Sequence, residues 1–295
     1  MVDRSLISVR ELAVEFRSDT GTVRALDSVS LDLRPGRVLG VVGESGCGKS
    51  VTARAILRIL DRNGAITAGS ILLDPEAPQQ TDLAKIDPES QQMRNVRGAR
   101  VGLIFQEPMS ALSMQYTIGN QLIEAIRAHN DPGKAAARQK AIQLLGDAGI
   151  PRPETRVDAY PFQLSGGLRQ RVGIALALAG DPDILIADEP TTALDVTTQA
   201  QILTLLRRLQ KDKNIALMLI THDMGVIAQM ADDVAVMYLG RVVEYAAVND
   251  VFHNPQHPYT RALLRSVPDL RATPRQRLST IGGAVPQSNA RPAGC

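Results

Sequence analysis

The sequence predicts an α/β protein with a parallel sheet, on two observations. The apolar segment 38–42 runs directly into the glycine-rich stretch Gly43–Ser50 and then into a segment with one apolar helical face. In the second half of the chain, apolar strands alternate with segments of helical periodicity, in the order 183–187, 197–210, 215–220, 224–231 and 234–238. Strands that alternate with helices favour parallel pairing, because a parallel crossover needs the length of a helix.

The other segments are predicted from their periodicity. Residues 5–16 and 23–33 alternate apolar and polar side chains on either side of a turn, which predicts two strands. The helix after the glycine-rich stretch is expected over 49–60, and the polar region 74–100 is expected to form surface excursions with short helical pieces. The remaining predictions are a strand at 101–105, a helical block at 117–150, a strand at 241–245, a helix at 258–267 and an extended end at 273–295.

These elements predict a division of the 295 residues into three parts. Residues 1–106 and 181–250 are expected to form the α/β core with an antiparallel β subdomain. Residues 107–180 are expected to form an inserted helical subdomain, and residues 251–295 a C-terminal extension.

Composition excludes several classes of protein. Net charge is +2, aromatic residues make up 3% and there is no Trp, so no feature favours binding of nucleic acid. No apolar run reaches the roughly 18–20 residues of a transmembrane helix, and the N-terminus lacks the apolar core of a signal peptide. The two cysteines, Cys47 and Cys295, predict a reducing, cytoplasmic setting rather than a disulfide framework.

The glycine-rich stretch has the spacing of a phosphate loop. Its glycines let backbone N–H groups turn toward phosphate oxygens at the positive end of the following helix. Lys49 is predicted to neutralise the β- and γ-phosphates, and Ser50 to hold Mg²⁺ through its hydroxyl. The alternative is that a glycine-rich turn matches this spacing by chance. The flanking strand and helix argue against it, because they are the context in which a phosphate loop occurs. The nucleotide-binding residues predicted here are Gly43, Glu44, Ser45, Gly46, Cys47, Gly48, Lys49, Ser50 and Val51.

Two acids end the apolar strand Ile184–Glu189. Asp188 is predicted to orient the metal shell and Glu189 to polarise an attacking water as general base. The alternative is a strand that happens to end in two acids. The carboxyl ends of parallel strands are where such a sheet binds its ligands, so the catalytic interpretation is preferred.

Three further positions follow strands or acids. Gln106 ends an apolar strand and is predicted to reach the Mg²⁺ or the water, although a Gln taken alone is more often a surface residue. His222 follows the strand at 215–220 and is predicted to contact the γ-phosphate, although a lone His is more often structural. The segment Thr192–Asp195 is predicted to pass between subunits, with Asp195 among the nucleotide-site residues.

A second glycine-rich helix start lies at Leu164–Gln170. The hydroxyl of Ser165 and the amides of Gly166 and Gly167 are predicted to bind an anion at the positive end of a helix that runs to about residue 179. The phosphate loop already surrounds the phosphates of its own nucleotide. We therefore expect the second site to serve a nucleotide bound to a partner subunit.

Together these motifs resemble the nucleotide-binding subunits of ATP-binding cassette (ABC) transporters over essentially the whole chain. The phosphate loop is similar to Walker A, and Ile184–Glu189 to Walker B. Gln106 matches the Q-loop, Leu164–Gln170 the signature motif, Thr192–Asp195 the D-loop and His222 the H-switch. The resemblance implies the fold of an ABC nucleotide-binding domain and hydrolysis of ATP with Mg²⁺. One alternative is a soluble ABC ATPase, but such proteins usually carry two cassettes and this chain has one. The other is a different P-loop enzyme such as a kinase, in which the signature motif would have no function.

Three segments narrow the resemblance to the oligopeptide/dipeptide importer ATPases: 105–112, His257–Leu264 and 281–286. This group implies two transmembrane permease subunits, a second ATPase subunit, an extracytoplasmic solute-binding protein and a place on the cytoplasmic face of a bacterial membrane. Peptides are the expected cargo, with oligosaccharides or nickel chelates as alternatives. Leu168 departs from the Gln of many signatures, and the adenine-stacking residue is left open between Phe16 and Arg24.

Related ATPases carry a C-terminal cysteine cluster for an iron–sulfur centre. Only Cys295 stands at the matching place. Because such a cluster needs about four thiolates, we expect that Cys295 cannot complete one alone. An inert terminal cysteine is the alternative.

Overall fold

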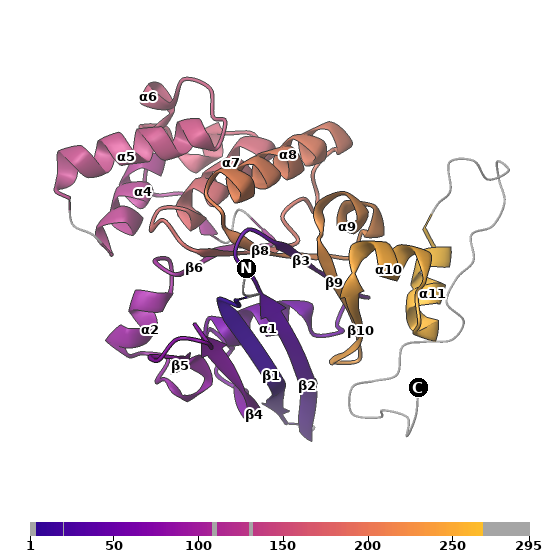
Figure 1. Ribbon diagram of the computed structural model, residues 1–295. Coiled ribbons are helices and arrows are strands. Elements are labelled where there is room, and N and C mark those ends of the chain that lie inside the picture. The colour runs from indigo at the N-terminus through magenta and orange to yellow at the C-terminus, as the bar shows by residue number, and fades with distance from the viewer. Residues whose placement is uncertain (1–3, 20, 108–110, 130–131, 268–295) are drawn as a thin grey trace, which may run out of the picture. The chain divides into compact units, whose positions relative to one another are not determined.

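The computed structural model describes residues 4–19, 21–107, 111–129 and 132–267. Contacts divide the chain into two compact units (Figure 1), one of Met1–Ile86 with Leu219–Cys295 and one of Asp87–Met218. We call the first of these unit 1 and the second unit 2. This division groups strand 101–104 and strand 184–188 with the helices, and the three-part division predicted above stays a prediction.

Unit 1 begins with an antiparallel sheet in the order β2-β1-β4-β5. Its strands are β1 (Ile7–Ser18), β2 (Gly21–Leu33), β4 (Gly64–Leu73) and β5 (Thr81–Asp82). The two strands predicted at the N-terminus are confirmed. The strand β4 was not predicted, because only Ile71 and Leu73 of its side chains are buried and the alternation is therefore weak.

The parallel part of unit 1 carries the phosphate loop. β3 (Val38–Val42) is buried at every residue and pairs in parallel with β9 (Asp233–Tyr238), which in turn pairs antiparallel with β10 (Arg241–Ala247). The unit boundary falls within β8 (Ala216–Thr221). The helices of this part are α1 (Lys49–Ile56), α9 (Met224–Met230), α10 (Val248–His253) and α11 (Pro258–Arg265), and a short 3₁₀ helix, η1 (Leu83–Lys85), follows β5.

The first helix is shorter than predicted. It was expected to reach Leu60, but α1 ends at Ile56. Arg58 adopts a left-handed φ of 55°, which an α-helix cannot contain. The strands and helices predicted at 38–42, 224–231, 234–238, 241–245 and 258–267 are all present within about two residues of the expected bounds.

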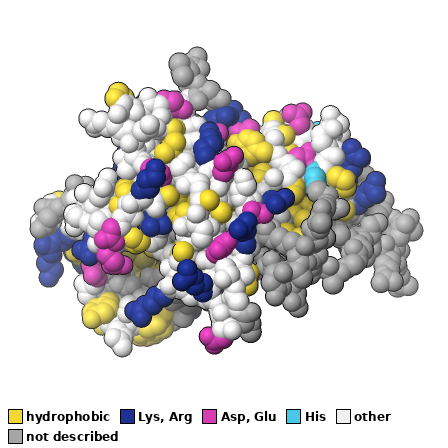
Figure 2. Space-filling model, turned by 90° about the horizontal axis from the view of Figure 1, so that it is seen from below, with side chains coloured by type: hydrophobic (Ala, Val, Ile, Leu, Met, Phe, Trp, Pro, Cys, Tyr) yellow, Lys and Arg dark blue, Asp and Glu magenta, His cyan; other side chains and the backbone are white. Residues whose placement is uncertain are grey.

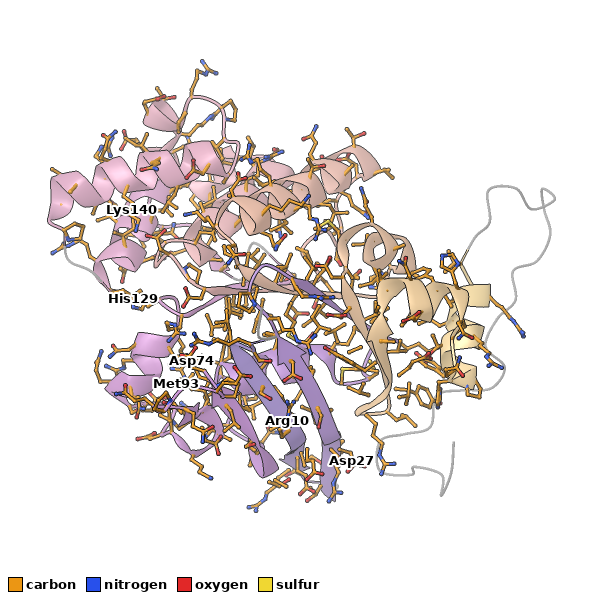
Figure 3. All side chains as sticks on the ribbon, in the orientation of Figure 1. Arg10, Asp27, Asp74, Met93, His129 and Lys140 are labelled. Carbon is orange, nitrogen blue, oxygen red and sulfur yellow. The ribbon has the colours of Figure 1, made fainter. Side chains whose placement is uncertain are left out.

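Side-chain and backbone bonds join the two sheets of unit 1 to the phosphate loop. Asp27 of β2, labelled in Figure 3, accepts a bond from Arg241 Nε at 2.8 Å, and its own N–H donates to Gly240 O at 2.8 Å. The N–H of Gly240 donates to Cys47 O at 2.9 Å. The turn between β9 and β10 therefore supports the loop from one side.

Unit 2 combines two parallel strands with helices. β6 (Val101–Ile104) and β7 (Ile184–Asp188) are the strands predicted from their apolar runs, and they pair with each other in parallel. The helices are α2 (Gln91–Val96), α4 (Ile118–Arg127), α5 (Lys134–Asp147), α6 (Pro153–Arg156), α7 (Gly166–Ala177) and α8 (Val196–Asp212), and a short 3₁₀ helix, η2 (Pro161–Gln163), precedes α7. Lys140 of α5 (Figure 3) forms an ion pair with Asp181, in the turn that leads into β7.

The surface is of mixed charge. On the face seen in Figure 2, basic and acidic side chains lie interspersed among apolar ones. Within the described ranges, no helix has both the length and the apolar character needed to cross a bilayer.

Candidate functional site

The phosphate loop of unit 1 is folded around the ammonium group of Lys49. This side chain is only 5% exposed, and its Nζ donates to Gly43 O at 2.8 Å and to Glu44 O at 2.9 Å. A buried ammonium needs such acceptors, because desolvation of an unpaired charge is costly. Since Nζ carries three donors, the group is also suited to a phosphate oxygen. Lys49 is thus held at the loop by two of its backbone carbonyl groups.

Gly48 at the start of α1 cannot be replaced by another residue without strain. Its φ is 107°, and a Cβ there would lie 2.7 Å from Leu26 Cδ2 and 3.0 Å from Ala25 O. The chain therefore turns tightly into α1, where the first backbone N–H groups have no partner within the helix. Ser50 and Val51 lie in this first turn. Such a helix start favours phosphate oxygens.

Cys47 is buried within the same loop, with 4% exposure. Burial raises the pKa of its thiol, and the nearby Lys49 only partly offsets that effect. A thiol with a raised pKa is a poor nucleophile at neutral pH. Cys47 is therefore a packing residue of the loop, which agrees with the small side chain expected at this position.

In unit 2, Glu189 is held by two hydrogen-bond donors. It follows β7, has a left-handed φ of 46° and is half-buried. Its Oε2 accepts from Thr192 Oγ1 at 2.8 Å and from Gln106 Nε2 at 3.3 Å. Asp188, the last residue of β7, is 7% exposed. The structure thus brings the predicted Gln106 and Glu189 together, and adds Thr192, whose hydroxyl was not singled out from the sequence.

The second glycine-rich element forms the start of α7. Ser165 is its N-cap, and the Ser165 Oγ accepts from Leu168 N at 3.4 Å. Ser165 and Gly166 are exposed, and a Cβ on Gly166 would meet nothing within 4 Å. A Cβ on Gly167 would lie 2.6 Å from Thr198 Cγ2, so Gly167 allows α7 to approach α8 closely. Gly166 therefore faces open space, whereas Gly167 packs against its own chain.

Asp195 caps the helix that Gly167 approaches. It accepts from Thr198 N at 3.0 Å and from Thr198 Oγ1 at 2.6 Å. The side-chain bond from Thr198, followed by the backbone bond, lowers the pKa of Asp195, so the carboxylate stays ionised at neutral pH. Unit 2 thus groups the second glycine-rich element with the segment predicted to pass between subunits.

His222 lies in unit 1, directly after β8, and is exposed. Its neighbours fix the backbone there. Thr221 Oγ1 accepts from Asp223 N at 3.0 Å, and Asp223 caps α9 by accepting from Gly225 N at 2.7 Å. The predicted His222 is therefore presented at the end of a strand by a defined turn.

Tyr259 contacts the phosphate loop, and this contact was not predicted from the sequence. The hydroxyl of Tyr259, in α11, accepts from Glu44 N at 3.1 Å. Burial raises the pKa of Tyr259, so the phenol stays neutral. No periodicity connects positions 44 and 259, and Tyr259 drew notice only as part of the segment that resembles the importer ATPases.

The residues predicted to bind Mg²⁺ offer oxygen ligands. Ser50 offers a hydroxyl in unit 1 and Asp188 a buried carboxylate in unit 2. Hard oxygen ligands of this kind suit Mg²⁺. Over the described ranges no group of three or more His, Cys, Asp or Glu is placed to hold a metal ion. Cys295, the residue considered for an iron–sulfur centre, lies outside those ranges.

Arg24, one of the two candidates for stacking on adenine, forms ion pairs with Glu15 at 2.9 Å and Asp27 at 3.3 Å. Phe16, the other, packs against Gly64, where a Cβ would lie 2.6 Å from its ring. Both candidates are therefore held by contacts within unit 1.

Two family models match the sequence. The model described as "ABC transporter" matches residues 26–192, and the model described as "Oligopeptide/dipeptide transporter, C-terminal region" matches residues 243–295. The dipeptide transport ATP-binding protein DppD of Escherichia coli strain K12 is 47% identical over 291 residues, which cover 99% of this chain and 86% of DppD. The DppD protein of Bacillus subtilis strain 168 is also 47% identical over 291 residues, covering 98% and 84%.

Solved structures agree with these matches. The ATP-binding cassette MJ0796, in a dimeric post-hydrolysis state bound to ADP and Pi, superposes with a TM-score of 0.71 at 25% identity, covering 82% of this chain and 98% of that one. CbiO1 of Clostridium perfringens, part of the CbiONQ ABC transporter complex, superposes with a TM-score of 0.70 at 27% identity, covering 85% and 92%.

Proposed function

This chain belongs to the ABC transporter family, within its oligopeptide/dipeptide group, and from that premise we propose which residues carry out its ATPase chemistry and which partners it serves. The chain is the ATP-hydrolysing subunit of a peptide importer. The observation that carries the proposal is the phosphate loop with its buried Lys49, which donates to two loop carbonyls. A loop of this kind binds the phosphates of ATP through backbone N–H groups and one fixed positive charge.

We assign the chemical roles as follows. Lys49 neutralises the β- and γ-phosphates, and Glu189 accepts a proton from the attacking water. Gln106 and Thr192 orient the Glu189 carboxylate through the bonds at 3.3 and 2.8 Å. His222 contacts the γ-phosphate. Catalysis is then positioning and electrostatic stabilisation of charge that develops on the phosphoryl group.

Mg²⁺ is the metal ion that suits the oxygen ligands offered by this chain. Ser50 and Asp188 are each proposed as a ligand, on their own donor chemistry, because a hydroxyl and a buried carboxylate are groups that this cation accepts. When bound, Mg²⁺ neutralises charge on the β- and γ-phosphates.

We further propose that Ser165 and Gly166 act on a nucleotide bound to another subunit. Gly166 is exposed and a Cβ built on it would meet nothing within 4 Å, which leaves this helix start open to an external anion. Dimeric association is the state described for MJ0796. The partners proposed are a second ABC ATPase subunit, two transmembrane permease subunits and an extracytoplasmic solute-binding protein. The subunit would then sit peripherally on the cytoplasmic face of the membrane, and dipeptides or short peptides would be the cargo.

The test is Glu189→Gln in the assembled transporter. ATP binding is expected to stay within about twofold of the unsubstituted protein, whereas turnover falls by about 10²–10⁴-fold, the contribution typical of a general base. Binding is measured by isothermal titration and turnover by phosphate release. Lys49→Ala serves as the comparison, because it should weaken binding itself. Undiminished hydrolysis in Glu189→Gln would remove Glu189 from its assigned role.

A further inference from the structure

Helix α11 contacts the phosphate loop through the side chain of Tyr259. The Tyr259 hydroxyl accepts the hydrogen bond from Glu44 N–H at 3.1 Å, although the two residues are 215 positions apart in the sequence. Both lie in unit 1. Tyr259 is 8% exposed, so this contact is largely shielded from solvent.

The position of Tyr259 is fixed from several directions. The backbone N–H of Tyr259 donates to His257 Nδ1 at 3.1 Å, which caps α11. The N–H groups of Gln256 and His257 donate to the two carboxylate oxygens of Glu244 in β10, at 2.7 and 3.0 Å. The Tyr259 ring packs on Tyr238 of β9, with centroids 4.5 Å apart. The hydroxyl is therefore presented to the loop by a rigid support.

Tyr259 and Lys49 hold the two ends of one peptide group. The Glu44 N–H that donates to Tyr259 belongs to the same peptide plane as Gly43 O, which accepts from Lys49 Nζ at 2.8 Å. Rotation of that plane would break both bonds. Hydrogen bonds at both ends of a peptide group also polarise one another. The orientation of this plane therefore determines where the Lys49 ammonium rests.

We propose that Tyr259 is a positioning residue for ATP: through the Gly43–Glu44 peptide group it holds the phosphate loop and Lys49 in the conformation that binds the nucleotide. The inference rests on the proposed function, because it assumes that this loop binds ATP. It gives the C-terminal part of the chain, beyond β9, a share in nucleotide affinity. A preorganised loop loses less conformational freedom on binding, so the effect belongs to affinity rather than to the hydrolytic step.

The test compares Tyr259→Phe with Tyr238→Phe in the full chain. Each variant removes one hydroxyl from the same pair of packed rings and keeps the ring, but Tyr259 is the member of the pair whose hydroxyl bonds to the loop. Tyr259→Phe is expected to raise the dissociation constant of ATP by about three- to tenfold, the range given by one net hydrogen bond. The kcat of the assembled transporter at saturating ATP is expected to change by less than about twofold, and Tyr238→Phe is expected to bind ATP normally.

Amide hydrogen exchange supplies a readout that does not depend on activity. The peptide containing Glu44 is expected to exchange faster in nucleotide-free Tyr259→Phe than in Tyr238→Phe, while α1 exchanges at the same rate in both. An unchanged dissociation constant in Tyr259→Phe, or equal weakening in both variants, would overturn the inference. Lys49→Ala separates this outcome from a failure of the proposed function: if Lys49→Ala binds ATP normally, the assignment of the loop itself is wrong.

Discussion

At the scale of single residues, the carboxylate of Glu189, our proposed general base, is held in one orientation by its own neighbours. Glu189 has a left-handed backbone, and its Oε2 accepts from Thr192 and Gln106. A strained φ of this kind persists only where surrounding interactions enforce it. Because Thr192 N also donates to Glu189 O at 3.2 Å, the turn after β7 holds both the backbone and the side chain of Glu189.

Thr192→Val is expected to lower kcat. It keeps the shape of the side chain and removes the donor at 2.8 Å, so the Glu189 carboxylate samples more orientations. We expect kcat to fall by about three- to tenfold with the KM for ATP unchanged, since one orienting hydrogen bond is lost and nucleotide contacts are not. Steady-state phosphate release measures both constants. Thr204→Val is the matched control, because its hydroxyl bonds to Ala200 O within α8 and not to Glu189. A raised KM with an unchanged kcat would contradict the orienting role.

At the scale of elements, the sequence predicts best where chemistry and periodicity agree. The succession of β3, phosphate loop and α1 was predictable, because the glycines and the lysine of the loop have a fixed spacing and lie between an apolar strand and a helix. The strand β4 was not, since Gly69 at φ 86° and few buried side chains interrupt its alternation. The contact of Tyr259 with Glu44 was not predictable either, because it depends on how β9, β10 and α11 pack and leaves no local pattern.

One turn links several elements of unit 2 electrostatically. Asp181, between α7 and β7, pairs with Lys140 of α5 and with Lys213, the C-cap residue of α8. Burial raises the pKa of Asp181, but the bonds and charges of Lys140 and Lys213 outweigh burial and lower its pKa overall. A carboxylate with a lowered folded-state pKa stabilises the fold above its unfolded pKa, and that contribution is lost as the pH falls through the folded value.

Asp181→Asn tests this link. Asn tolerates the left-handed φ of 53° at this position, so the change removes charge without backbone strain. At pH 7 we expect the melting temperature to fall by about 1–3 °C, a small change because the ion pairs are partly exposed and screened by solvent. Below about pH 3.9, the ordinary pKa of Asp, the difference should shrink. Differential scanning calorimetry at pH 7 and pH 3 measures both. A difference that grows in acid would contradict the assignment.

At the scale of the whole molecule, the chain carries two glycine-rich helix starts with different surroundings. The phosphate loop is closed around Lys49, whereas the start of α7 is open at Gly166. This difference selects the substitution for a test of action between subunits. A side chain at Gly167 would collide with Thr198 and disturb its own subunit, but one at Gly166 meets only open space. Gly166→Asp therefore adds a negative charge to the open helix start without disturbing the packing of α7.

Mixing two inactive variants separates the two sites. Gly166→Asp is expected to bind ATP like the unsubstituted chain but to hydrolyse it at least about 100-fold more slowly, because a carboxylate repels the phosphates of the partner's nucleotide. Lys49→Ala loses hydrolysis through its own loop. If the chain pairs with itself, a mixed dimer joins the intact loop of one copy to the intact α7 of the other. An equal mixture should then recover about a quarter of the original activity, since half the dimers are mixed and each has one complete site. If the mixture recovers no activity, but each variant hydrolyses ATP once a different ATPase subunit is added, the pair is heteromeric. Full activity in Gly166→Asp alone would exclude action between subunits, because the site that receives the added charge would then have no part in hydrolysis.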